Sequence, residues 1–151
     1  HTDHVLFDIK LLDPDLHQAH TGQSNETIRA NLLSIADHIR DVNGGKASAS
    51  NCRGMKLWIR TPLIPHVTAT PENIGAISQF IHDDLLDVVE RWELCAFNSA
   101  CKSKYERMGL SWSYAEEPLL RQSEVDTVIE AALSTAIAAD SVVVTGLIAR
   151  G

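Results

Sequence analysis

Apolar residues along the chain alternate between short continuous runs and a helical spacing. Residues 5–9 are apolar except for Asp8 and precede a proline-containing stretch, which predicts a buried strand. From Ser24 to Val42, apolar side chains recur every three or four positions until a glycine pair at 44–45 interrupts them. This spacing predicts an amphipathic helix that ends at the glycines.

A second strand and helix follow the first pair. Residues 55–60 predict the next strand, and Pro62 and Pro65 predict a turn after it. Thr70 is a favourable N-cap residue, and Pro71 suits the first helical position, where a missing N–H group breaks no intrahelical hydrogen bond. We therefore expect a helix that begins at Pro71 and turns its isoleucines inward.

The pattern repeats once more and then closes with a strand. Residues 91–95 or 91–96 predict a third strand, and a long polar connection follows it. Ser123, with Asp126 three residues later, has the form of a capping box, so we expect a helix that is capped by Ser123. The valines at 142–144 predict a fourth strand.

Alternation of this kind predicts an α/β fold, in which parallel strands are joined by right-handed crossovers and helices cover the sheet. Four strands with two open edges suit a segment of a larger barrel better than a free-standing sheet. The small polar tract at 44–51 is taken as a surface loop, so residues 1–151 are expected to form one unit. We also expect the chain to continue upstream of His1 and to self-associate through an apolar sheet edge.

Composition and charge narrow the function classes. The chain is 44% hydrophobic and 22% charged, which is typical of one soluble globular domain. It contains neither an apolar run of membrane-spanning length nor a signal peptide, so we expect a cytoplasmic protein without a membrane partner. A net charge of −7 without a basic stripe disfavours nucleic-acid binding. Three cysteines without C-x-x-C spacing argue against a disulfide framework and a zinc site.

Polar residues stand at the carboxyl ends of the predicted strands, where parallel α/β folds build their sites. Asp8 and Lys10 end the first strand on one face, Arg60 ends the second, and Asn98 lies past the third. Asp8 and Lys10 would either hold the two ends of a zwitterionic amino acid or form a local ion pair. Arg60 would either clamp a carboxylate or ribose hydroxyls, or bridge to an acid on a neighbouring strand. The residues alone leave both choices open.

Two other residue pairs are weaker candidates for metal binding or for nucleophilic catalysis. His17 and His20 lie three residues apart, but the sequence offers no third metal ligand nearby, so a capping or packing role is favoured. Cys95 and Cys101 flank a loop without a fixed basic neighbour, so structural or incidental thiols are favoured. Neither pair predicts a metal centre or a nucleophile.

Four stretches of the chain together match one enzyme family. They are Val-Leu-Phe-Asp-Ile-Lys at 5–10, followed by Asp13, His17, Thr21, Gly22, Ser24, Asn25 and Asn31; Trp-Ile-Arg-Thr-Pro-Leu-Ile-Pro at 58–65; Glu-Asn-Ile at 72–74; and Glu93 and Leu94 through Lys104, Tyr105 and Gly109. In this order and separation they resemble the glycyl radical enzyme activating enzymes, the pyruvate formate-lyase activating enzyme family of the radical S-adenosylmethionine superfamily. The resemblance covers nearly the whole chain, which would be the C-terminal part of such an enzyme.

The resemblance implies a partial, TIM-like (β/α) barrel of the radical S-adenosylmethionine type, to which this chain supplies the C-terminal strand–helix repeats. It implies a [4Fe-4S] cluster that binds S-adenosylmethionine and cleaves it reductively to a 5′-deoxyadenosyl radical. That radical would abstract hydrogen from a glycine of a pyruvate formate-lyase-like partner enzyme. An electron donor such as flavodoxin or ferredoxin would reduce the cluster of this anaerobic oxidoreductase.

Site residues follow from the resemblance by position. Asp8, Ile9 and Lys10 match the family's S-adenosylmethionine-binding triplet, and Arg60 matches an arginine that reaches the same ligand. Asn98 takes the position of a ligand-contacting histidine, and Asp8 would also contribute to a monovalent-cation site. These residues would position the cofactor rather than transfer protons, so the resemblance implies no catalytic residue in this chain.

Two local departures from the family pattern stand out. His66 follows Pro65 where the family usually has glycine, which predicts a changed turn after the second strand. Asn98 replaces the family's histidine in the sequence Cys-Ala-Phe-Asn at 95–98. Asparagine still donates and accepts hydrogen bonds, but it does not titrate near neutral pH. The change would mark a subgroup with a different partner.

The largest departure is the cluster motif Cys-x-x-x-Cys-x-x-Cys with its following Gly-rich segment, which we expect upstream of His1. Cys52, Cys95 and Cys101 do not have this spacing and are not expected to bind the cluster. Residues 1–151 alone are therefore expected to be inactive. The alternative functions are activation of an anaerobic ribonucleotide reductase, and a non-catalytic remnant or interaction module on the same scaffold.

Overall fold

The computed structural model describes residues 3–44 and 54–149. Their elements, in chain order, are β1 (His4–Asp8), α1 (Pro14–Thr21), α2 (Glu26–Asn43), β2 (Lys56–Leu63), α3 (Pro71–Asp84), β3 (Val89–Ala96), η1 (Ser99–Cys101), α4 (Lys102–Arg107), α5 (Gln122–Ala132), η2 (Ala139–Ser141) and β4 (Val142–Thr145). Cys52 and most of the loop predicted at 44–51 lie outside the described residues. Within the described ranges, no helix is both long enough and apolar enough to cross a membrane.

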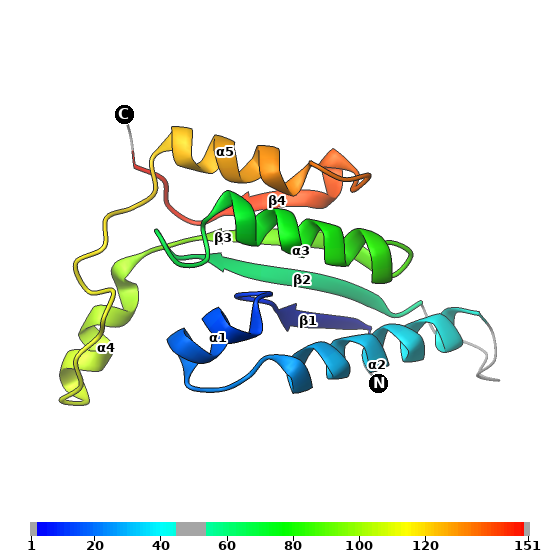
Figure 1. Cartoon of the computed structure of the whole chain (residues 1–151), viewed down its shortest axis with the longest axis horizontal. Helices are drawn as coiled ribbons and strands as arrows, with labels where there is room; N and C mark the ends of the chain where they lie inside the picture. Colours follow the sequence, from blue (N-terminus) through cyan, green and yellow to red (C-terminus); the bar gives the residue numbers. More distant parts are fainter. Residues whose placement is uncertain (1–2, 45–53, 150–151) are drawn as a thin grey trace.

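The four strands form one parallel sheet whose spatial order, β1-β2-β3-β4, is also their order in the chain. Each strand therefore returns beside its predecessor through a crossover. Figure 1 shows α2, α3 and α5 in the three successive crossovers. This arrangement confirms the predicted α/β fold class, and a chain-ordered parallel sheet is what a segment of a (β/α) barrel contains.

One face of the sheet is covered by α2, α3 and α5 (Figure 1). Along β2 and β3, buried side chains alternate with half-buried or exposed ones, because successive residues of a strand point to opposite faces. Burying a leucine or isoleucine fully contributes about 1.5–3 kcal/mol relative to leaving it exposed. The hydrophobic core between helices and sheet includes Leu32, Ile39, Leu57, Ile59, Leu63, Ile74, Ile77, Ile81, Trp92, Leu94, Val125 and Val128.

The opposite face of the sheet, here called the open face, carries half-buried and exposed side chains. Since Leu57 and Ile59 point toward the helices, their neighbours in β2 point away from them. The open face presents Leu6 and Asp8 of β1, Trp58 and Arg60 of β2, and Arg91, Glu93 and Cys95 of β3. The polar residues that the sequence marks as candidates therefore lie outside the hydrophobic core.

β2 continues to Leu63, past the turn that was predicted at Pro62. The Arg60 carbonyl oxygen accepts a hydrogen bond from the Ile9 N–H group at 2.9 Å, so the backbone polar groups of Arg60 face β1. The backbone of Pro62, two residues later, also faces the side of β1, but β1 has already ended at Asp8. The missing N–H group of proline therefore interrupts no ladder, and the chain turns only after Leu63.

The starts of the first and third α-helices follow capping rules. α3 begins as predicted, with the Thr70 hydroxyl accepting a hydrogen bond from the Asn73 N–H group at 3.2 Å and proline at the first helical position. α1 was not predicted, because its eight residues are too few to show helical spacing. Asp13 accepts a hydrogen bond from the Leu16 N–H group at 2.8 Å, so the aspartate and the proline after it begin a helix.

The cap predicted for α5 at Ser123 is wrong, because the helix begins earlier. Arg121 is the N-cap residue, and its N–H group donates to the Glu124 carboxylate at 2.8 Å. Ser123 and Asp126 therefore lie inside the helix, where the Asp126 carboxylate accepts a hydrogen bond from the Gln122 side chain at 2.8 Å. The acid that fixes the start of α5 is Glu124.

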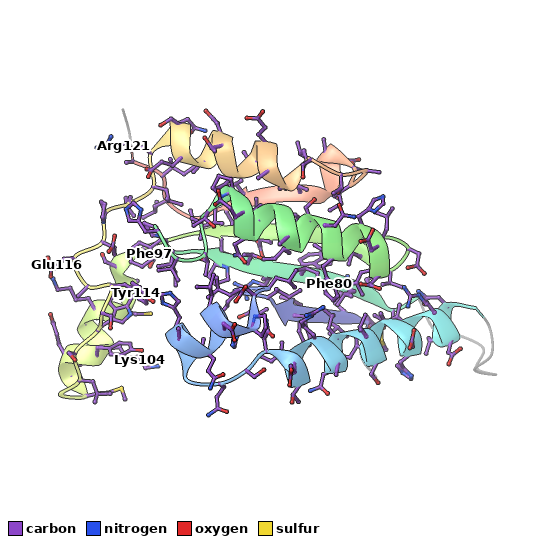
Figure 2. All side chains as sticks on the ribbon, viewed as in Figure 1. Phe80, Phe97, Lys104, Tyr114, Glu116 and Arg121 are labelled. Carbon is purple, nitrogen blue, oxygen red and sulfur yellow. The ribbon has the colours of Figure 1, made fainter. Side chains whose placement is uncertain are left out.

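Residues 97–121 leave the end of β3 as an arm beside the sheet, which includes η1 and α4 (Figure 1). Trp112 stacks on Phe97 and Tyr105, with ring centroids 5.8 and 5.7 Å apart. It also meets Tyr114 edge-on at 6.5 Å. Figure 2 shows Phe97 and Tyr114 where the arm joins the sheet. The predicted polar connection is therefore held together by aromatic packing.

Candidate functional site

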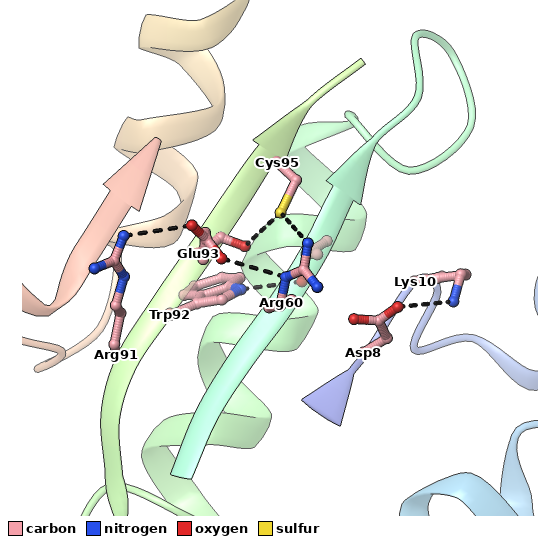
Figure 3. Close-up of polar contacts among 8 residues, drawn as sticks. Asp8, Lys10, Arg60, Arg91, Trp92, Glu93 and Cys95 are labelled. Atoms are coloured by element: carbon pink, nitrogen blue, oxygen red, sulfur yellow. Dashed lines mark hydrogen bonds and ion pairs between the residues drawn. The ribbon is translucent and has the colours of Figure 1, made fainter. Parts of the chain in front are cut away.

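Strand register brings three charged side chains into one row across the open face. Asp8 of β1 is paired with Arg60 of β2, and Arg60 is paired with Glu93 of β3. Residues paired on neighbouring strands point to the same face of a sheet. An acid, a guanidinium group and a second acid therefore follow one another across three strands, near the carboxyl ends of β1 and β2 (Figure 3).

Glu93 stands between two arginines. One of its carboxylate oxygens lies 3.3 Å from Arg60 Nε, and the other lies 3.3 Å from Arg91 Nη2 (Figure 3). The Glu93 side chain is only 16% exposed, whereas that of Arg60 is 42% exposed. Counted with Asp8 and Lys10, the cluster holds three cations and two carboxylates, so it keeps one surplus positive charge that a ligand carboxylate could meet.

Arg60 also contacts the Cys95 thiol, with 3.8 Å between Nη2 and Sγ (Figure 3). The pKa of the Arg60 guanidinium is raised above its ordinary value, mainly by this contact with Cys95 and further by the charges of Asp8 and Glu93. Arg60 is therefore always positively charged. It forms the bridge to a neighbouring acid that was one of its two predicted roles, while its exposed part still offers donors to a ligand.

Asp8 and Lys10 lie side by side at the end of β1, with 3.4 Å between Lys10 Nζ and Asp8 Oδ2 (Figure 3). Both side chains are about half exposed, so the pair contributes about 0–1 kcal/mol and can be separated at small cost. Ile9 is buried, and its N–H group donates to the Arg60 carbonyl oxygen, which anchors the triplet to β2. The monovalent-cation role of Asp8 stays a prediction.

Asn98 lies beyond β3 at the start of η1, where its Oδ1 accepts a hydrogen bond from the Ala100 N–H group at 3.0 Å. It lines a hollow of about 310 Å³ at the ends of β2 and β3, beside the arm. The other lining residues are Pro62, Leu63, Ile64, Cys95, Ala96, Phe97, Cys101, Trp112 and Tyr114. Cys95 lines this hollow and also touches Arg60, so it connects Asn98 with the charged row. Asn98, Cys95 and Arg60, together with Asp8 and Lys10, are here called the rim.

The two histidines of α1 do not face a common ligand. His17 is buried, with its Nδ1 2.7 Å from the Gln23 carbonyl oxygen and 3.0 Å from the Thr21 hydroxyl, which confirms the packing role. His20 is hydrogen-bonded to the Tyr114 hydroxyl of the arm at 3.2 Å. In the part of the chain that the structure describes, no three His, Cys, Asp or Glu side chains are grouped to hold a metal ion.

Cys95 and Cys101 are free thiols, the first half-buried and the second exposed. Within residues 3–44 and 54–149, neither stands in a group of three potential metal ligands. An iron–sulfur cluster needs several thiolates around one centre, so the described residues do not fit such a group. Cys95 instead takes part in the site as a neighbour of Arg60.

The turn after β2 keeps a glycine-like backbone although His66 stands there. His66 has a φ angle of 60°, in the left-handed region that favours glycine. The histidine thus takes up a backbone conformation that glycine adopts more easily, and a change of this turn relative to the family stays a prediction. Its exposed side chain lies between two hollows of about 330 and 300 Å³, both also lined by Thr70 and Glu72.

Neither Glu93 nor Arg91 stands out from the sequence as a site residue, yet both lie beside the rim. The sequence carries one signal that could have indicated them. Positions 91, 93 and 95 share one face of the predicted strand, and all three are polar or ionisable. Their approach to Arg60 depends on the register between β2 and β3. A single sequence does not specify that register.

Comparison with known proteins points to one group of enzymes. No protein-family model matches the chain. The pyruvate formate-lyase-activating enzyme of Streptococcus mutans is 30% identical over 111 residues, which are 74% of this chain and 36% of that enzyme. The (2S)-3-sulfopropanediol dehydratase activating enzyme of Klebsiella oxytoca is 27% identical over 123 residues, 82% of this chain and 34% of that enzyme. The chain thus spans about a third of the length of these relatives.

A solved structure has the same fold. A domain of pyruvate-formate lyase-activating enzyme from Bacteroides vulgatus matches with a TM-score of 0.63 at 17% identity, over 95% of this chain and 68% of that chain. This likeness confirms the predicted partial-barrel fold. Together with the sequence identities, it shows that the chain is a distant homologue of the pyruvate formate-lyase-activating enzymes and the other activating enzymes of glycyl radical enzymes.

Proposed function

We propose that the protein containing this chain binds S-adenosylmethionine at the rim of the open face and uses it to generate a glycyl radical on a partner enzyme. The observation that carries the proposal is the row of Asp8, Arg60 and Glu93 across three strands. Homology supports the reaction class, because both relatives named above are activating enzymes. Their names give different partners, so the proposal concerns pyruvate formate-lyase-like enzymes as a class.

The chemistry of the rim fits the polar groups of S-adenosylmethionine. Asp8 would accept hydrogen bonds from the ligand's ammonium group, and Lys10 and Arg60 would donate to its carboxylate and ribose hydroxyls. Ile9 would contribute through its backbone, because its side chain is buried. Asn98 would contact the ligand from the hollow beside the arm.

These residues would hold and orient the ligand rather than transfer protons. Arg60 keeps its charge at every pH, so it suits a fixed electrostatic contact. Bound S-adenosylmethionine, reduced at a [4Fe-4S] cluster, supplies the hydrogen-abstracting chemistry of the family. The cluster ligands would come from residues outside this chain, and a flavodoxin or ferredoxin would donate the electron.

Equilibrium dialysis with radiolabelled S-adenosylmethionine tests the proposal. The experiment uses the complete polypeptide that contains this chain, with its cluster reconstituted without oxygen. Arg60→Gln should weaken binding about tenfold or more, because a hydrogen bond from a charged group contributes about 1.5–3 kcal/mol.

Arg91→Gln is the matched control, because Arg91 contacts the same Glu93 carboxylate as Arg60 does. Arg91 precedes Glu93 by two residues in β3 and so lies further than Glu93 from the carboxyl end of that strand. Its affinity should stay within about twofold of the wild-type value, below the change expected from losing one charged hydrogen bond. A wild-type protein that binds no S-adenosylmethionine, or an equal loss in the two variants, would refute the proposed role of the rim.

A further inference from the structure

The loop after β1 is held by side chains. The three successive carbonyl groups of residues 10–12 each accept a hydrogen bond from the side-chain amide of Asn25 or Asn73. Carbonyl groups that are removed from water need such donors, and here both donors stand at the starts of helices, α2 and α3. Both asparagines belong to motifs of the family resemblance, which gives neither of them a role.

Asn73 binds two loops at once. Its Oδ1 accepts a hydrogen bond from the Leu12 N–H group at 3.1 Å, and its Nδ2 donates to the Lys10 carbonyl oxygen at 2.9 Å. The same Nδ2 donates to the Thr68 carbonyl oxygen at 3.0 Å, in the loop after β2. Asn73 is buried in the first turn of α3, so the start of this helix joins the two loops.

Thr68 carries this support to the end of β2. Its hydroxyl donates to the Pro62 carbonyl oxygen and accepts a hydrogen bond from the Ile64 N–H group at 2.7 Å. Thr68 is only 2% exposed, so water does not compete for these bonds. Pro62 follows Arg60 by two residues in β2, and the strand end that presents Arg60 is thereby fixed to α3.

Asn25 supports the β1 loop from the side of α2. Its Nδ2 donates to the Leu11 and Leu12 carbonyl oxygens at 3.0 and 2.8 Å, and the residue is 2% exposed. Both of these hydrogen bonds from Asn25 go to the β1 loop, whereas Asn73 bonds the β1 loop and the loop after β2. The two asparagines therefore hold the same loop, but only Asn73 ties it to β2.

We propose that Asn73 is a positioning residue for the ligand-binding rim, and that Asn25 assists it at the β1 loop. This inference rests on the proposed function, because it concerns the same S-adenosylmethionine site. Asn73 acts through the Lys10 carbonyl group and through Thr68. If the two loops were released, only a fraction of the molecules would present Lys10 and Arg60 together, and the apparent Kd would rise by the inverse of that fraction.

Asn73→Asp in the complete polypeptide tests the proposal. The variant keeps the size of the side chain and the acceptor for Leu12, but it places a carboxylate against two carbonyl oxygens. S-adenosylmethionine should bind about 25-fold more weakly, because losing one net hydrogen bond changes an equilibrium about fivefold and two are lost. Lowering the pH should recover part of this loss relative to the wild type, because the protonated carboxyl group regains a donor.

Asn73→Ala removes all three hydrogen bonds without adding a charge, and it is the second variant. It should weaken binding in the same direction and speed hydrogen exchange at the Leu12 amide, which loses its acceptor. This exchange is measured without ligand, so it reports on the loop alone. The exchange measurement therefore tests the support of the loop independently of S-adenosylmethionine binding.

Two controls distinguish positioning from general destabilisation. Asn31→Asp makes the same chemical change at an exposed position of α2, and Ile77→Val removes a buried methylene group from α3. Both should keep the wild-type affinity within about twofold and leave exchange at Leu12 unchanged, because neither residue bonds the two loops. The positioning role is overturned if both Asn73 variants bind as tightly as Ile77→Val, or if Asn73→Ala leaves this exchange unchanged. Failure of the wild-type protein to bind S-adenosylmethionine overturns the proposed function instead.

Discussion

Replacing Arg40 tests how the end of α2 is fastened to the turn between α3 and β3. Arg40 Nε and Nη2 donate to the two carboxylate oxygens of Asp87 at 2.8 and 2.7 Å. Nη2 also donates to the Asp84 carbonyl oxygen at 2.6 Å, and Nη1 donates to Asp37 within α2 at 2.9 Å. One guanidinium group therefore joins two segments that lie 47 residues apart in the chain.

The expected magnitude follows from geometry and exposure. The Arg40 and Asp87 side chains are 35% and 60% exposed, so water screens their attraction. We place their coupling at about 1 kcal/mol, at the upper end for surface pairs, because the contact is bidentate. The hydrogen bond to the Asp84 carbonyl group adds about 0.5–1 kcal/mol. Arg40→Gln should therefore lower the free energy of unfolding by about 1.5–2 kcal/mol, and Asp87→Asn by about 1 kcal/mol.

The coupling should depend on pH in one direction. The pKa of the Asp87 carboxyl group is lowered, first by its hydrogen bonds from Arg40. A carboxyl group whose pKa is lower in the folded state stabilises the fold above its unfolded-state pKa. The stabilisation is lost as the pH falls through the folded-state pKa. The coupling should therefore be complete at neutral pH and disappear well below the ordinary carboxyl pKa of 3.8.

Urea unfolding of the wild type, the two single variants and the double variant gives this coupling as a double-mutant cycle. The ion pair between Lys102 and Glu116 on the arm is the control, because Glu116 is 86% exposed and no measurable coupling is expected there. A cycle for Arg40 and Asp87 that gives less than about 0.3 kcal/mol at neutral pH, or the same coupling in acid, would refute the reasoning.

Two further predictions concern backbone conformation and association. His66→Gly should stabilise the protein by about 0.5–1 kcal/mol in thermal unfolding, because a left-handed non-glycine residue costs more than the unfolded-state entropy that glycine adds. An unchanged or lower Tm would show that the histidine side chain itself holds the turn. The chain should self-associate through the edge of β1 and the 54% exposed Leu6, and Leu6→Lys should reduce the oligomers detected by light scattering. A wild-type monomer at high protein concentration would contradict this expectation.

Helices with their own start signals could be predicted from the sequence, whereas short elements and exact ends could not. α3 follows Thr70 and Pro71 because both local preferences act at the same point. α1 shows too little periodicity over eight residues to be recognised. At α5, Ser123 is a favourable cap residue, but the helix begins after Arg121, whose N–H group donates to the Glu124 carboxylate. Local patterns therefore locate elements better than they locate boundaries.

The candidate site could be predicted in part. Asp8, Lys10 and Arg60 share the rim because parallel strands bring their carboxyl ends to one edge, although their role as ligand contacts stays a prediction. Glu93 could not be placed, because its neighbours depend on the register between β2 and β3. The hollow beside Asn98 also needs aromatic side chains from the arm, and no periodicity in the sequence ties that segment to the rim.

Pro62 has a consequence for how β1 can align on β2. A shift of β1 by one residue would turn each of its side chains to the opposite face. A shift by two residues toward the carboxyl end of β2 would keep the faces but would require an N–H group from Pro62, which has none. The proline therefore disfavours the nearest misalignment that hydrophobic patterning would tolerate. It thereby favours the register in which Asp8 lies opposite Arg60.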